Sequence, residues 1–138
     1  MSQPRLLLAD DHRETADLLR SLLQSEFDVV GQVENGLALV DAAARLRPDV
    51  IVSDISMPGI DGITAASSII RTNPAARIVL ITVNGDPLLV ARGFKTGALG
   101  FVLKRTAGET LLPAVRSALR GERYVNDDSP SKDASRNR

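Results

Sequence analysis

Three carboxylates, a hydroxyl and an amine each follow a short apolar segment of the chain. Asp10 and Asp11 come after RLLLA, Asp54 after VIVS, Thr82 after RIVLI, and Lys104 after LGFVL. If these apolar segments are parallel strands of one sheet, their carboxyl ends share an edge and the five side chains collect there. Carboxylates that converge without a neutralising partner repel one another, and each raises the pKa of the others. A divalent cation would remove that cost.

The donor types in this set favour magnesium. The candidate ligands are hard oxygens, because the chain has no cysteine and a single histidine, His12, which we expect to be an exposed loop residue. An aspartate can also accept a phosphoryl group as an acyl phosphate. Transfer onto Asp54 would give the other groups a role, since Mg²⁺ and Lys104 would neutralise negative charge. The Thr82 hydroxyl would then donate to a phosphoryl oxygen.

Each of these residues taken alone also has a structural explanation. Asp11 stands three residues before Glu14, which is the spacing of a helix capping box. Asp54 precedes a Pro-Gly turn, Thr82 is β-branched and suits a strand, and a lone lysine is usually a solvated surface charge. The convergence of the residues, rather than any one of them, favours a site.

The elements that would position these residues alternate between strands and helices. Four segments are almost continuously apolar, as parallel strands covered on both faces are, and a fifth is more polar and fits an edge strand. Helical periodicity fills the intervals. The alternation predicts an α/β domain with a five-stranded parallel sheet flanked by five helices. The expected strands are 5–9, 27–33, 50–53, 77–81 and 99–103, and the expected helices are 15–23, 37–46, 62–71, 87–97 and 111–119.

The last predicted helix contains a proline. Pro113 lacks a backbone donor and is unfavourable inside a helix. Either this helix begins late, near Thr110, so that Pro113 lies in its first turn, or it is kinked at Pro113.

Length and composition indicate one globular domain. The chain has 138 residues, of which 43% are hydrophobic and 25% charged. Lys and Arg number 17 and so do Asp and Glu, which argues against a nucleic-acid or membrane surface as the main partner. The absence of cysteine suits a cytoplasmic protein, and the N-terminal apolar run is too short for a signal peptide or a membrane span.

Together these motifs resemble the receiver domain of bacterial two-component response regulators. The resemblance rests on the acidic pair after the first strand, SDISMPGIDG after the third, Thr82, and GFVLK at the end of the fifth. It implies a (βα)5 flavodoxin-like, or CheY-like, fold with strand order 2-1-3-4-5. FDVVGQVENG and RGERYV further resemble the NarL/FixJ-type subfamily, whose receivers are usually linked to a LuxR-type helix-turn-helix domain. We expect residues 1–125 to form the receiver domain and residues 126–138 a polar tail or truncated linker.

The resemblance also implies partners and a metal. Asp54 would be phosphorylated by a sensor histidine kinase or a phosphotransfer protein. Asp10, Asp11 and Asp54, with the backbone carbonyl of Ser56, would hold Mg²⁺. No DNA-binding element is expected in this chain, which would be either a single-domain regulator or part of a longer one.

Further residues would bind the phosphoryl group and respond to it. Thr82 and Lys104 would contact it, and Phe101 matches the aromatic switch position. The change would reach the surface of the fourth helix, fifth strand and fifth helix, which leaves open a homodimer formed on phosphorylation. Val83 stands where the family usually has a small residue and could slow phosphoryl entry, and Asn84 is at a position that tunes dephosphorylation.

The sequence leaves one alternative function open and argues against two others. The bulk of Val83 suits a pseudo-receiver, a protein-interaction module that is seldom phosphorylated. A hydrolase of the haloacid-dehalogenase type would carry its nucleophile and a DxD pair on the first strand, whereas here the isolated acid follows the third. A flavin- or nucleotide-binding sheet would need a glycine-rich loop after the first strand, and none follows it.

Overall fold

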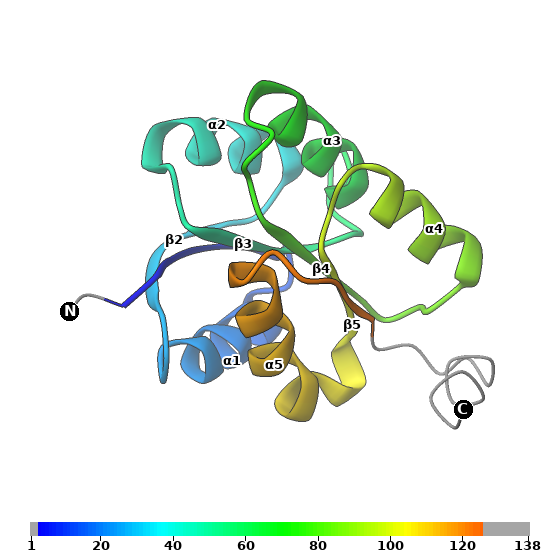
Figure 1. Cartoon of the computed structure of the whole chain (residues 1–138). Coiled ribbons are helices and arrows are strands. Elements are labelled where there is room, and N and C mark those ends of the chain that lie inside the picture. The colour runs from blue at the N-terminus through cyan, green and yellow to red at the C-terminus, as the bar shows by residue number, and fades with distance from the viewer. Residues whose placement is uncertain (1–2, 126–138) are drawn as a thin grey trace.

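The chain forms a parallel sheet between two layers of helices (Figure 1). The structure is a computed structural model that describes residues 3–125. Among these residues, six strands form one sheet in the order β2-β1-β3-β4-β5-β6. The strands are β1 (Arg5–Ala9), β2 (Asp28–Val33), β3 (Val50–Asp54), β4 (Ile78–Thr82), β5 (Gly100–Leu103) and β6 (Tyr124–Val125). The helices are α1 (Arg13–Leu23), α2 (Gly36–Leu46), α3 (Gly62–Thr72), α4 (Pro87–Lys95) and α5 (Ala107–Leu119).

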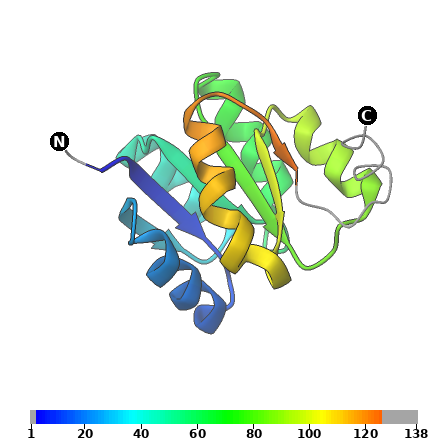
Figure 2. The same cartoon turned by 60° about the horizontal axis from the view of Figure 1, so that its bottom comes forward.

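Helices cover both faces of the sheet, which explains the apolar strands. Helices α1 and α5 lie on one face, and α2, α3 and α4 lie on the other (Figures 1 and 2). Successive strand residues point to opposite faces. Leu6 and Leu8 therefore join the core against α1 and α5, while Leu7 joins the core against α2, α3 and α4. All three leucines are fully buried, so neither face of β1 has room for a polar side chain.

The prediction of five strands was wrong in number but right in order. The five expected strands are present in the order 2-1-3-4-5, and β2 is the edge strand that its polar sequence indicated. A sixth, β6, pairs in parallel with β5 and is visible beside it at the sheet edge in Figure 2. Its two residues are too few to show any periodicity, so the sequence could not indicate it. The predicted polar tail, residues 126–138, lies outside the described residues.

Pro113 lies inside α5, so of the two alternatives at this proline the late start near Thr110 was wrong. A 3₁₀ turn at Lys104–Thr106 leads directly into α5 at Ala107. The helix therefore loses one backbone donor at Pro113 but keeps the apolar face that packs on the sheet. No helix within residues 3–125 is long and apolar enough to cross a membrane.

The end of β3 and the start of α3 approach so closely that only glycine fits between them. The amide of Gly62 donates to the carbonyl of Ile55 at 2.7 Å. A Cβ atom at Gly62 would lie 2.1 Å from the carbonyl oxygen of Asp54 and 2.9 Å from Cα of Ile55. Because both neighbours are backbone atoms, neither can rotate away. Asp54 is thus fixed at the strand end by the helix that follows it.

We expect Gly62→Ala to lower the free energy of unfolding by about 1–3 kcal/mol, the usual cost of overpacking. Urea denaturation checks this. Gly108→Ala is the matched control, since no atom lies within 4 Å of a Cβ built at Gly108 in α5. It should leave stability unchanged or raise it by up to about 1 kcal/mol, because alanine is the better helix former. Equal effects of the two substitutions would show that the approach at Gly62 is not tight.

Candidate functional site

A half-buried lysine and two buried carboxylates meet at the carboxyl edge of the sheet. Asp10 follows β1, Asp54 is the last residue of β3, and Lys104 begins the turn after β5. Lys104 Nζ lies 2.8 Å from Asp54 Oδ2 and 3.2 Å from Asp10 Oδ2. The side chain of Lys104 is 13% exposed, that of Asp54 is 3% exposed and that of Asp10 is 0% exposed. The parallel strands thus gather charges that are 44 and 50 positions apart in sequence, as the sequence predicted.

Backbone amides fix the orientation of the two buried carboxylates. Asp10 Oδ1 accepts a hydrogen bond from the amide of His12 at 2.9 Å, and Asp54 Oδ1 accepts one from the amide of Ser56 at 3.2 Å. The oxygens that remain face the cluster. Among the described residues, Asp10 Oδ2 and Asp11 Oδ1 are buried and have no hydrogen-bond partner. Burying a carboxylate oxygen in this way is costly unless a cation compensates it.

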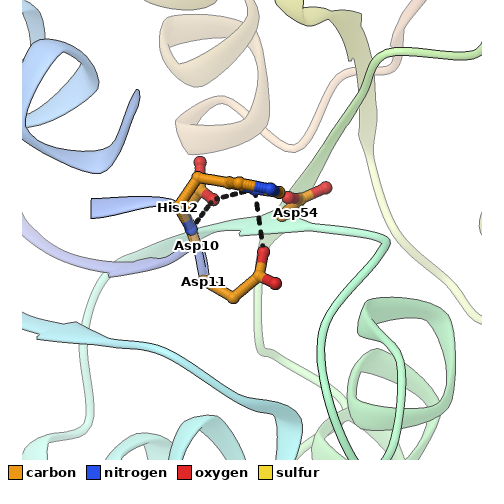
Figure 3. A group of neighbouring side chains, drawn as sticks. All are labelled: Asp10, Asp11, His12 and Asp54. Carbon is orange, nitrogen blue, oxygen red and sulfur yellow. Dashed lines mark hydrogen bonds and ion pairs between the residues drawn. The ribbon is translucent and has the colours of Figure 1, made fainter. Parts of the chain in front are cut away.

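Four side chains could bind one metal ion together (Figure 3). Asp10, Asp11, His12 and Asp54 each offer a ligand atom, and these atoms lie within 4.8 Å of one another. Three of the four donors are carboxylates and two buried oxygens lack hydrogen bonds, so the residues fit a hard divalent ion such as Mg²⁺.

The capping-box explanation for Asp11 was wrong. The N-cap of α1 is His12, one residue later, and no side chain caps this helix within the part of the chain that the structure describes. The Asp11 carboxylate therefore belongs to the cluster and not to the helix end. Asp10 instead supports the start of α1, through the amide of His12.

The cluster shifts the pKa of two of its members. Burial raises the pKa of the Asp54 carboxyl, the hydrogen bond and the charge of Lys104 oppose that shift, and the negative charge of Asp10 adds to it. Burial alone would lower the pKa of Lys104, but the hydrogen bond and the charge of Asp54, together with Asp10, raise it. Lys104 therefore stays charged, and the negative charge of Asp54 is only partly compensated.

The other predicted residues lie on neighbouring elements. Thr82, the last residue of β4, is 4% exposed, and its Oγ1 accepts a hydrogen bond from the amide of Asn84 at 3.2 Å. Phe101 is fully buried in β5, beneath α4, where its ring lies 6.4 Å from that of Phe94. Val83 is 72% exposed in the loop after β4. Thr82 and Val83 thus stand at the same sheet edge as Asp54, whereas Phe101 lies in the core.

His12 is the residue whose place the sequence did not predict. Its side chain is 66% exposed, as expected, yet Nδ1 lies 3.1 Å from Asp11 Oδ1 and 3.6 Å from Asp10 Oδ1. Its position directly after two acids was the available signal. A histidine in a loop is common enough that adjacency alone could not separate a cluster member from a bystander.

Comparison with known proteins identifies the family. Residues 6–116 match the response regulator receiver domain. The chain is 33% identical to the transcriptional regulatory protein YdfI of Bacillus subtilis, over 90% of this chain and 59% of that protein. It is 30% identical to the chemotaxis protein CheY of Listeria monocytogenes, over 83% of this chain and 97% of that protein.

A solved structure agrees with these relatives. A two-component response regulator of the LuxR family from Aurantimonas sp. SI85-9A1 superposes with a TM-score of 0.90 at 28% identity, over 99% of each chain. The chain spans 52–59% of the length of the first transcriptional regulators it matches, including YdfI. By sequence, fold and the arrangement of its acidic cluster, the chain belongs to the receiver-domain family of two-component response regulators.

Proposed function

We propose that the chain is a phosphoacceptor switch, in which Asp54 receives a phosphoryl group from a sensor histidine kinase or a phosphotransfer protein in a Mg²⁺-dependent reaction. One observation carries the proposal. Asp54 is a buried carboxylate held against Lys104, beside buried acidic oxygens that lack hydrogen bonds. A structural ion pair would need one carboxylate for one lysine, whereas this cluster has surplus negative charge that only a bound cation offsets.

The transfer forms one bond and breaks another. An oxygen of Asp54 attacks the phosphorus of a phosphohistidine, the P–N bond breaks, and its electron pair stays on the imidazole nitrogen of the kinase. Lys104 Nζ, 2.8 Å from Asp54 Oδ2, is placed to pair with the phosphoryl group on the same carboxylate. The Thr82 hydroxyl already accepts from the amide of Asn84, so its hydrogen can donate to a phosphoryl oxygen.

The metal would be held by residues that the structure brings together. Asp10, Asp11 and Asp54 supply carboxylates, and the Ser56 carbonyl is the fourth protein ligand we propose. Bound Mg²⁺ would supply neutralisation of the negative charge that spreads over the phosphoryl oxygens. The same groups would assist loss of the phosphoryl group to water, at a rate that Asn84 would tune, so the chain is a signalling domain and not an enzyme with a free substrate.

The proposed output follows the contacts of Phe101. Movement of Thr82 toward the phosphoryl group would alter packing at the end of β4, next to β5. Phe101 in β5 contacts Phe94 of α4, so a change there reaches the surface of α4, β5 and α5. That surface would control an output, transcription where a DNA-binding domain is attached, and it is the proposed site of a homodimer formed on phosphorylation.

The pseudo-receiver alternative is not favoured. A module that had lost phosphorylation would be free to lose its acidic residues, yet Asp10, Asp11, Asp54 and Lys104 all converge. Val83, which motivated that alternative, projects into solvent. It can narrow the approach to Asp54 but takes no space inside the cluster.

Asp54→Asn should abolish labelling by radioactive acetyl phosphate or by a kinase, because the amide cannot form the acyl phosphate. Asp61→Asn is the matched control, since Asp61 caps α3 by accepting from the amide of Thr64 and asparagine caps equally well. The control should be labelled like the wild type. Stable labelling of Asp54→Asn would overturn the proposed acceptor.

Val83→Ala should raise the rate of labelling by acetyl phosphate a few-fold, because the shorter side chain opens the approach to Asp54. Leu88→Ala is the control, since Leu88 in α4 is as exposed as Val83 but belongs to the helix and not to the loop. Initial rates at several donor concentrations check this. Unchanged rates in Val83→Ala would show that Val83 does not limit access.

Without Mg²⁺, Asp54→Asn should be more stable than the wild type at neutral pH, because burial raises the pKa of Asp54 and penalises its ionised form. A carboxyl whose folded pKa is raised contributes stability below its unfolded pKa, near 3.8, and loses that contribution as pH rises through the folded pKa. The gap between the two proteins should therefore shrink on acidification. Saturating Mg²⁺ should stabilise the wild type more than the variant. Urea unfolding at several pH values, with and without Mg²⁺, measures both effects. If the wild type is more stable than Asp54→Asn at neutral pH without Mg²⁺, the ionised Asp54 does not destabilise the fold and the prediction is wrong.

A further inference from the structure

We propose that His12 is a metal ligand of the acidic cluster and that it gives the cluster a selective affinity for imidazole-preferring divalent ions such as Zn²⁺. The inference rests on the proposed metal binding by Asp10, Asp11 and Asp54 and adds a nitrogen donor to it. The effect concerns which ion the site retains. It does not require that the second ion support phosphoryl transfer.

The spacing of the donor atoms suits a shared ion. Ligand atoms about 2.1 Å from one metal are about 3.0 Å apart at right angles and about 3.4 Å apart in a tetrahedron. His12 Nδ1 lies 3.1 Å from Asp11 Oδ1 and 3.6 Å from Asp10 Oδ1. Figure 3 shows the imidazole beside the three carboxylates, with its nitrogen toward Asp10 and Asp11.

The contact between His12 and Asp11 is close but is not a hydrogen bond. Although Nδ1 is 3.1 Å from it, Asp11 Oδ1 is buried and has no hydrogen-bond partner among the described residues. A ring N–H aimed at that oxygen would have satisfied it. Two atoms that approach without a hydrogen between them are arranged as two ligands of one ion would be.

The remaining oxygen of Asp10 faces Lys104 and not His12. Asp10 Oδ2 belongs to a side chain with 0% exposure, and its nearest cation is Lys104 Nζ at 3.2 Å, whereas Asp10 Oδ1 is the oxygen 3.6 Å from His12 Nδ1. Asp54 Oδ2 already receives the hydrogen bond of Lys104 at 2.8 Å. The lysine thus compensates Asp54 most directly and leaves acceptor capacity on Asp10 and Asp11, the two residues nearest His12.

The backbone holds His12 in place while its ring stays accessible. Its amide donates to Asp10 Oδ1 at 2.9 Å and its carbonyl accepts from Ala16 at 2.8 Å, which opens α1. The side chain makes no capping hydrogen bond within the described residues and is 66% exposed. The imidazole is therefore not needed to begin the helix, and an ion can reach it from solvent.

The donor chemistry predicts which ions would respond. Carboxylates suit Mg²⁺ and Mn²⁺, whereas imidazole suits Zn²⁺, Ni²⁺ and Cu²⁺. The chain has one histidine and no cysteine, so no other imidazole or thiolate competes for such an ion. The same fact makes the imidazole signals in an NMR spectrum those of His12 alone.

The test compares Zn²⁺ and Mg²⁺ binding in the same mildly alkaline buffer. His12→Phe keeps a ring of similar size but removes both nitrogens. We expect it to weaken Zn²⁺ binding, measured by competition with a chromogenic chelator, by about tenfold or more. Mg²⁺ binding, measured by NMR titration, should be little changed. In the wild type, the imidazole nitrogen resonances should shift with Zn²⁺ and not with Mg²⁺.

Two further variants separate the outcomes. Arg13→Gln, at the next position and without a role in the cluster, should leave both affinities unchanged, and Asp11→Asn should weaken both. If His12→Phe weakens Zn²⁺ and Mg²⁺ equally, or neither, His12 only positions or neutralises the aspartates and the inference is wrong. If the wild type binds neither ion, the proposed metal site itself fails, which is a different result.

Discussion

The site depends on one interaction, the contact of Lys104 Nζ with Asp54 at 2.8 Å and with Asp10 at 3.2 Å. It joins the ends of three strands, β1, β3 and β5, across the carboxyl edge of the sheet. One lysine cannot satisfy three carboxylates. Burial, and after it the charge of Asp10, raises the pKa of Asp54. Two acidic oxygens have no hydrogen bond within the described residues, so the site is held together by Lys104 yet still short of positive charge.

The rest of the fold makes that shortage tolerable. The four central strands are buried on both faces, and close packing of their side chains keeps the strand ends in fixed positions. Gly62 holds the end of β3 against the start of α3 at a distance where no other residue fits. Burial in the sheet and its helices therefore offsets the electrostatic cost at one edge. A site built on loops alone could not hold unsatisfied carboxylates in fixed positions.

The sequence predicted this edge well because parallel strands leave a strong signal. Continuous apolar runs located the strand ends, and the charged residues directly after those runs, Asp10, Asp54 and Lys104, form the site. The sequence missed β6, because two residues carry no period. It left the start of α5 open between two alternatives, because Pro113 conflicts with the helical pattern around it. It predicted that His12 is exposed but not that its Nδ1 lies 3.1 Å from Asp11 Oδ1, since that contact depends on a side-chain rotamer that no sequence pattern records.

The position of His12 bears on two properties of the proposed metal site: how tightly it holds a hard ion, and which ions it prefers. A cluster of oxygen donors holds a hard ion weakly and lets it exchange, which suits a group that must meet phosphate oxygens. A nitrogen donor at the solvent-exposed rim adds affinity only for ions that prefer imidazole. In the metal site that we propose, the buried part of the cluster would set the charge that an ion must neutralise, and the exposed rim would set which ion does so. Because His12 is fixed by its backbone bonds to Asp10 and Ala16, its ring can change partner without disturbing α1 or the acidic pair.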